Sequence, residues 1–223
     1  VSDVQAAVIY NQPAAYSPNN FTYLTSATGQ DAPGYHTFDS FELLQPATIT
    51  SFNWQGLYYD FENLTNNPVG PNTTSWQIGL FASDPITGLP STQLFAETLP
   101  AINVSVQFVA DAFIVDANNS RVHILQFHAD LVNPFQVDAG VGYWFSPFSL
   151  QPTANPLFGW TSSLIGDGTS VQRDLTTGVL SVQAGDRAFC VEGTAVPEPA
   201  SLSLLAVVLA GMGLRRWRRQ ANS

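Results

Sequence analysis

The side chains best suited to catalysis or metal binding are sparse in this 223-residue sequence. Its three histidines form no recognisable motif: His36 stands alone, and His123 and His128 are five residues apart. That spacing puts the last two on opposite faces if residues 121–129 form one strand. We therefore predict structural or surface roles for the histidines and no zinc site.

The single cysteine, Cys190, excludes an internal disulfide and any zinc site built from several cysteines. It lies in the segment DRAFCVEG, where its alternation with apolar neighbours is typical of a strand. No histidine or helix start lies near it in the sequence to activate the thiol. We expect a buried, inert side chain.

Carboxylates are numerous enough to raise two further possibilities, calcium binding and glycoside hydrolysis. Glycoside hydrolysis needs two facing carboxylates, and a pair such as Asp60 and Glu62 carries almost no specificity for that role. Hard oxygen donors in loops could hold Ca²⁺, although without EF-hand spacing. The candidate ligands are Asp111, Asp116, Asn118 and Asn119 in one group and Asp167 with Asp174 in another. We predict no cofactor, with a structural Ca²⁺ as the alternative.

Catalytic motifs are missing from the sequence. It has no GxSxG nucleophile elbow and no Gly-rich phosphate loop after a strand. We therefore predict a protein without catalytic activity. A secreted hydrolase that uses unidentified carboxylates is the alternative.

Aromatic rings could bind sugars, because an exposed ring can lie against a pyranose while Asn and Gln bond its hydroxyls. In a sandwich fold, large aromatic residues belong to the core more often than to such a platform. The candidate glycan contacts are Trp54, Tyr58, Tyr59, Trp144 and Trp160, with Tyr143 beside them. They make a carbohydrate-binding module the second functional hypothesis.

The sequence predicts that short strands carry the candidate residues described above. Turn signals such as DPITGLP, GDGTS and QAGD separate runs rich in Val, Ile, Phe, Thr and Trp. In SWQIGLFA the apolar residues alternate on one face, and Phe81 makes the other face apolar too, as in a strand covered on both sides. We predict an all-β protein, an antiparallel β-sandwich that is jelly-roll-like, with strands at 36–44, 47–55, 75–82, 93–99, 121–129, 142–149, 157–162 and 187–193.

Charge divides the chain into two unequal parts. Residues 1–196 hold sixteen acidic residues and three Arg, a net charge of −13, whereas residues 197–223 hold Glu198 and four Arg, a net charge of +3. An acidic body is repelled by phosphate backbones, and no basic stripe with interleaved aromatics is present. We therefore predict no nucleic-acid partner.

The end of the sequence has three consecutive parts that suit a membrane. Two prolines in VPEPAS keep the backbone extended, and residues 201–214 then contain no charged side chain. As a helix this run would span about 21 Å, short of a hydrocarbon core of about 30 Å. The segment RRWRR follows, and its positive charge favours a cytoplasmic position, with the body outside.

This order of VPEPAS, apolar run and RRWRR resembles the PEP-CTERM sorting signal of Gram-negative bacteria. The resemblance implies export, transient anchoring in the inner membrane through the C-terminal helix, and processing by an exosortase, a membrane protease or transpeptidase. Such proteins are commonly associated with exopolysaccharide and biofilm, at the cell surface or in the extracellular matrix. The residues that match the signal are Pro197, Glu198, Pro199, Arg215, Arg216, Arg218 and Arg219.

The resemblance also divides the chain. It predicts a β-sandwich body at residues 1–193, a linker at 194–200, and a short transmembrane helix with an Arg-rich end at 201–223, the signal itself covering 197–219. Segments such as TITSFNWQGLYYD and VDAGVGYWFSP are similar to the N-terminal domains often attached to this tag, for which no activity is agreed. A tail anchor that is never cut is the alternative, and an amphipathic interfacial helix fits worst because the run has no polar face.

Overall fold

The computed structural model describes residues 6–15, 23–24, 26–27, 34–60, 70–113, 121–153 and 156–196. Within these ranges the chain is built from strands joined by turns, with one short 3₁₀ helix, η1 (Ala101–Asn103). The strands form two seven-stranded sheets and one two-stranded sheet. The prediction of an all-β protein is confirmed for this part of the chain.

The first sheet is centred on the long strand β5 (Ala47–Tyr59). One edge of β5 pairs with β9 (Arg121–Val137), which pairs in turn with β8 (Val104–Phe113). Along its other edge, the first part of β5 pairs with β16 (Phe189–Ala195) and the last part pairs with β11 (Leu157–Trp160). Outside these lie β1 (Ala7–Gln12), beside β16, and β2 (Tyr23–Leu24), beside β11. All of these pairings are antiparallel.

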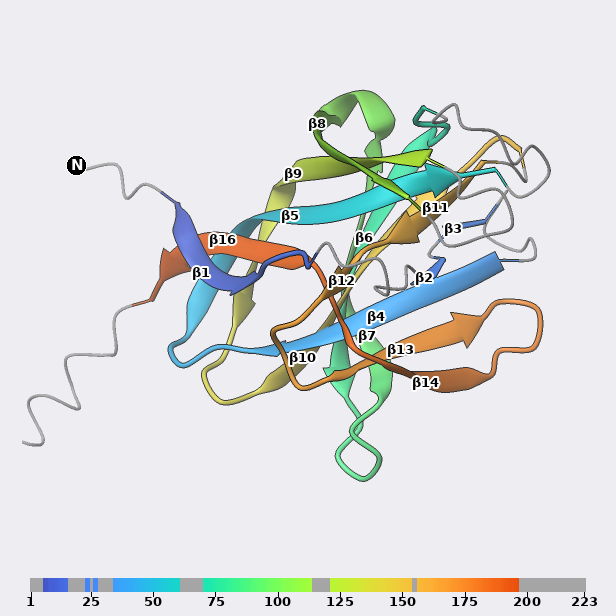
Figure 1. Ribbon diagram of the computed structural model, residues 1–223. Helices are drawn as coiled ribbons and strands as arrows, with labels where there is room; N and C mark the ends of the chain where they lie inside the picture. Colours follow the sequence, from blue (N-terminus) through green and yellow to red (C-terminus); the bar gives the residue numbers. More distant parts are fainter. Residues whose placement is uncertain are drawn as a thin grey trace, which may run out of the picture.

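The second sheet has β10 (Gly142–Leu150) between β4 (Gly34–Glu42) and β6 (Ser75–Ser83). Strand β6 pairs with β7 (Pro90–Pro100), and β4 pairs with β13 (Thr169–Asp174), which pairs with β14 (Leu180–Ala184). The short β3 (Ser26–Ala27) pairs antiparallel with β4 and parallel with β10. The small third sheet joins β12 (Ser162–Ser163) to β15 (Asp186–Arg187). In Figure 1, strands β5 and β9 of one large sheet lie above strands β4 and β13 of the other.

Aromatic side chains from the two large sheets meet in a shared core. Phe52 of β5 stacks on Phe145 of β10, with ring centroids 4.3 Å apart and planes 4° from parallel. Trp54 of β5 meets Trp76 of β6 edge-on, with centroids 5.0 Å apart. Because these rings are almost fully buried, they form a hydrophobic core between the two sheets. The finer expectation of jelly-roll connectivity stays a prediction.

The alternation expected for residues 75–82 is confirmed. Trp76, Ile78 and Leu80 point into the shared core. Phe81 points the other way and is also buried, in a second cluster with Phe38. Strand β6 is therefore covered on both faces, as its apolar outward residue predicted.

A buried polar cluster fixes the chain just before β16. The carboxylate of Asp39 accepts hydrogen bonds from the backbone N–H of Arg187 and from the Gln12 side chain. The Arg187 guanidinium donates to Ser162 Oγ (3.0 Å) and to the Gly185 carbonyl (2.9 Å). Burial is the main cause that raises the pKa of Asp39 well above its usual range, and the nearby Asp186 carboxylate adds to it. The cluster ties β1, β4 and β15 together, so it sets where β16 begins.

The predicted transmembrane helix falls on residues 201–223, which lie outside the described residues. Within the described ranges, no helix has both the length and the apolar character needed to cross a membrane.

Candidate functional site

The expected sorting segment leaves the body from the end of β16. This strand lies between β1 and β5, and its last pairs join Thr194 to Thr48 and Ala195 to Ala47. The backbone N–H of Val196 then donates to the Pro46 carbonyl at 2.8 Å. Strand β16 thus continues two residues past the boundary predicted at residue 193, because β5 supplies Thr194 and Ala195 with backbone partners.

Gly193 allows β16 to approach β5 closely at this end. The pairing of the two strands is irregular between Glu192 and Gly193. An ideal Cβ on Gly193 would overlap the Thr48 carbonyl oxygen and lie 3.1 Å from the Cα of Ile49. A residue without a side chain is required here for a steric reason.

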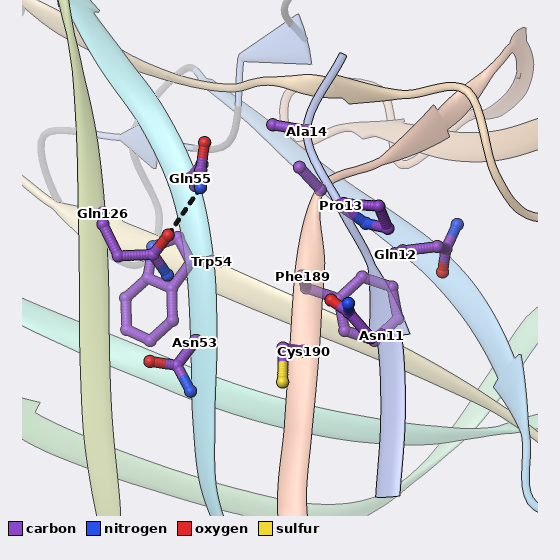
Figure 2. A pocket seen from close by; sticks show the side chains of 11 residues that line it. Asn11, Gln12, Pro13, Ala14, Asn53, Trp54, Gln55, Gln126, Phe189 and Cys190 are labelled. Carbon is purple, nitrogen blue, oxygen red and sulfur yellow. Dashed lines mark hydrogen bonds between the residues drawn. The ribbon is translucent and has the colours of Figure 1, made fainter. Parts of the chain in front are cut away.

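The outer face of the first sheet holds a small crevice beside β16, with a volume of about 50 Å³. Figure 2 shows its side chains coming from β1, β5, β9 and β16. Gln55 donates from Nε2 to Oε1 of Gln126 at 2.6 Å across two neighbouring strands. The other lining residues are Asn11, Gln12, Pro13, Ala14, Asn53, Trp54, Ala188, Phe189 and Cys190.

The crevice offers hydrogen bonding without formal charge. Its polar lining consists of side-chain amides and one thiol, and each amide can both donate and accept. Two of these amides also bond within the protein: Asn53 donates to Glu192 at 2.8 Å and faces Nδ1 of His128 at 3.0 Å, and Gln12 donates to Asp39 at 3.2 Å. Groups of this kind fit the hydroxyls of a neutral, hydroxylated ligand.

Cys190 lies on this wall and is half-buried. Burial, together with the Glu192 carboxylate, raises the pKa of the Cys190 thiol to about 11. The thiol is therefore protonated at neutral pH and a poor nucleophile. Its position in a strand is confirmed.

The aromatic residues predicted to contact glycans are core residues. A ring that is covered on both faces cannot stack on a sugar, so the prediction of glycan contacts at these positions is wrong. Trp54 and Trp160 are 0% exposed, Tyr58 is 1%, Trp144 is 5%, Tyr143 is 6% and Tyr59 is 8%. They were proposed because sequence shows that a ring is present but not whether its face is covered.

The predicted calcium ligands do not meet in the described part of the chain. Asp111 pairs instead with Arg121 and with His123, 2.9 Å away. Asp167 bonds Ser40 and Thr169, while Asp174 bonds the backbone of its own turn. Across the described ranges no three His, Cys, Asp or Glu side chains gather as a metal site would require. Asp116, Asn118 and Asn119 lie outside those ranges, as does Glu62 of the carboxylate pair considered for hydrolysis.

The three histidines are held by separate surroundings. His36 packs among the rings of Phe38, Phe81 and Phe148. Burial, with a smaller effect from Arg173, lowers the pKa of His36 to about 3, so the ring is neutral. His123 and His128 both belong to β9, as expected.

A comparison with known families decides what the end of the chain is. Residues 195–219 match the PEP-CTERM protein-sorting motif. The chain carries a PEP-CTERM sorting motif. The matched segment includes the predicted signal residues from Pro197 to Arg219, which lie outside the described residues. Its first residue, Ala195, is the last residue of β16.

The PEP-CTERM motif implies export, anchoring in the membrane for sorting, and recognition by an exosortase, a membrane processing enzyme. No curated protein matches the chain. The motif covers the tail and the last bonded residues of the sheet, so the activity of the body has to be argued from its own structure.

Sequence reasoning missed the amide-lined crevice. Four of its eleven lining residues come from β1 and the residues that follow it, a segment outside the strand ranges predicted from the sequence. The available signal was the alternation in VIYNQ, where Tyr10 and Gln12 face inward and Asn11 is exposed.

Proposed function

We propose that this chain is an exported, non-enzymatic protein of the cell surface or extracellular matrix, processed by an exosortase and associated with exopolysaccharide and biofilm. The observation that carries the proposal is the PEP-CTERM motif that begins at Ala195, directly at the end of the sheet. A motif in this place makes the β-sandwich the cargo of the sorting tail.

The crevice beside β16 supports the polysaccharide part of the proposal. Amide side chains from three strands are presented there together, in a lining without charged residues. A neutral polysaccharide can exchange its bonds to water for bonds to such amides, and each bond contributes about 0.5–1.5 kcal/mol. Binding by one such crevice is weak, which suits a matrix component present at many repeating sites.

Cell fractionation tests the delivery part of the proposal. We expect the protein in the matrix fraction of a strain that has the exosortase, and in the inner membrane of a strain that lacks it. Full-length protein in the membrane of both strains would support a permanent tail anchor instead.

Polysaccharide pull-down tests the binding part separately. We expect the double variant Asn11→Ala with Gln126→Ala to bind about three- to tenfold less of the matrix polysaccharide, the equivalent of one or two hydrogen bonds. Gln136→Ala is the control, since this exposed glutamine lies on β9 outside the crevice. Equal binding by all three proteins would contradict a role for the crevice.

A further inference from the structure

Four segments of the body meet where the sorting tail leaves it. Strand β1 begins here, because Ala7 pairs with Gly193. The loop of residues 43–46 ends here, because Pro46 accepts from Val196. The loop of residues 138–141 joins it, because Gly140 donates to the Leu43 carbonyl at 2.9 Å. We call residues 6–8, 43–46, 138–141 and 195–196 the tail end of the body.

The tail end exposes four apolar side chains, and apolar side chains such as Ile102 and Leu164 are exposed elsewhere on the body as well. Leu44 is 94% exposed, Val8 58%, Val141 42% and Val196 39%. Two acidic side chains are exposed here as well: Asp138 belongs to the tail end, and Glu42 directly precedes residue 43. Exposed apolar groups that gather at one place are typical of a surface that contacts a partner or a membrane.

The length of the tail restricts how far this end can move from the membrane. Only residues 197–200 separate Val196 from the uncharged run 201–214. Four extended residues span at most about 14 Å. The run itself would span about 21 Å as a helix, less than the hydrocarbon thickness of about 30 Å, so the mismatch draws its flanking residues toward the lipid. The tail end therefore stays within about 14 Å of the membrane surface while the chain is anchored.

We propose that the tail end of the body docks on the lipid surface, with Leu44 and Val141 entering the headgroup region, for as long as the tail anchors the chain. The proposal rests on the membrane anchoring that the sorting motif implies. A tether of a few residues gives a very high effective concentration, so a weak apolar contact is enough to hold the body. The short tether selects this end of the body over other exposed apolar side chains, and the acidic charge of the body opposes contact of its other faces with anionic lipids.

Docking fixes the orientation of the body toward the membrane. Strand β6 runs between this end of the second sheet and the opposite end. Near one end of β6, Ala82 pairs with Tyr143, which follows Val141 closely in the sequence. At the other end, seven residues and about 23 Å away at about 3.3 Å per residue, Ser75 pairs with Pro100, which is followed by η1 and its 92% exposed Ile102. Ile102 is thus a control that matches Leu44 in exposure and size but lies far from the docked end.

The first experiment uses the full-length chain in vesicles of phosphatidylethanolamine and phosphatidylglycerol. In a Cys190→Ala background, an environment-sensitive dye is attached to Leu44→Cys or to Ile102→Cys. We expect quenching by spin-labelled lipids and a blue-shifted emission at position 44 and neither effect at position 102. Equal quenching at the two positions in floated vesicles would overturn docking while leaving anchoring intact.

A second experiment avoids a dye at the tail end. Energy transfer from a dye at position 102 to acceptor lipids reports how far that end stays from the membrane. In the variant with Leu44→Asp and Val141→Asp we expect the docked population to fall about tenfold, because burial of one large aliphatic side chain is worth at least that factor. The body then tumbles on its tether and energy transfer from position 102 rises. Unchanged transfer would overturn the proposal.

Two further outcomes separate the causes of failure. If the full-length protein does not float with the vesicles, the anchoring is contradicted and docking falls with it. If position 44 is protected only in membranes that contain the exosortase, the tail end binds the enzyme, and the lipid proposal is overturned.

Discussion

Gly193 offers the most direct perturbation of the strand that presents the sorting motif. In Gly193→Ala the new methyl group would overlap the Thr48 carbonyl oxygen and crowd Ile49 Cα. These are backbone atoms, so the clash is relieved only if β16 moves away from β5. Overpacking of this kind costs about 1–3 kcal/mol. Weakening one or two of the hydrogen bonds beyond it, such as that from Val196 to Pro46, adds about 0.5–1.5 kcal/mol each.

We therefore expect Gly193→Ala to lower the free energy of unfolding by about 2–4 kcal/mol, which for a protein of this size lowers the melting temperature by roughly 4–16 °C. The assay is thermal unfolding of the full-length chain in mild detergent, followed by fluorescence of the buried tryptophans. Gly70→Ala is the matched control, because a Cβ there meets nothing within 4 Å. It should be neutral or stabilise by about 0.4–1 kcal/mol. Equal melting temperatures for Gly193→Ala and Gly70→Ala would refute the close approach of β16 to β5.

Three other predictions concern the core and the crevice. The pKa of Asp39 is raised in the folded state, so protonation of Asp39 at low pH favours folding, and this contribution to stability is lost as pH rises through the folded pKa. Asp39→Asn should remove that part of the pH dependence of stability. Parallel curves of stability against pH for the two proteins would contradict this. Trp160→Ala should destabilise the protein by about 3–5 kcal/mol, since the ring is fully buried and its Nε1 donates to the Ala188 carbonyl at 2.8 Å. Polysaccharide binding per folded molecule should not change. A stable variant with weaker binding would show that the ring contacts the glycan. Alkylation of Cys190 should be slow at neutral pH and rise about tenfold per pH unit toward its pKa of about 11; fast labelling at neutral pH would show that the thiol is activated.

The sorting motif could be predicted from sequence because it is a linear signal. Its parts are recognised by order and composition, and no tertiary contact is needed to place them. Strands such as β5 and β6 were readable for a similar reason, since an apolar alternation marks the face that meets the core. The last two residues of β16 could not be predicted, because the partner strand β5 determines how far β16 continues past residue 193.

The surface of the body could not be predicted in the same way. The sequence predicts Trp144 as a glycan contact, but its ring lies in a second buried cluster with Phe38 and Phe81. Whether the outer face of a sheet is covered depends on segments from elsewhere in the chain that pack on it. The pattern of apolar residues within one strand does not show which segments these are. The crevice and the apolar tail end have the same origin, because each collects side chains from segments far apart in sequence.

The most direct test of the central claim is the intact mass of the protein recovered from cells and medium, compared with a variant in which Pro197, Glu198 and Pro199 are all Ala. The sorting account predicts that the natural protein ends near residues 196–200 and has lost Arg215–Arg219, while the variant keeps them. If both proteins retain the Arg-rich end, the tail is not processed, and the account of an exosortase substrate is contradicted.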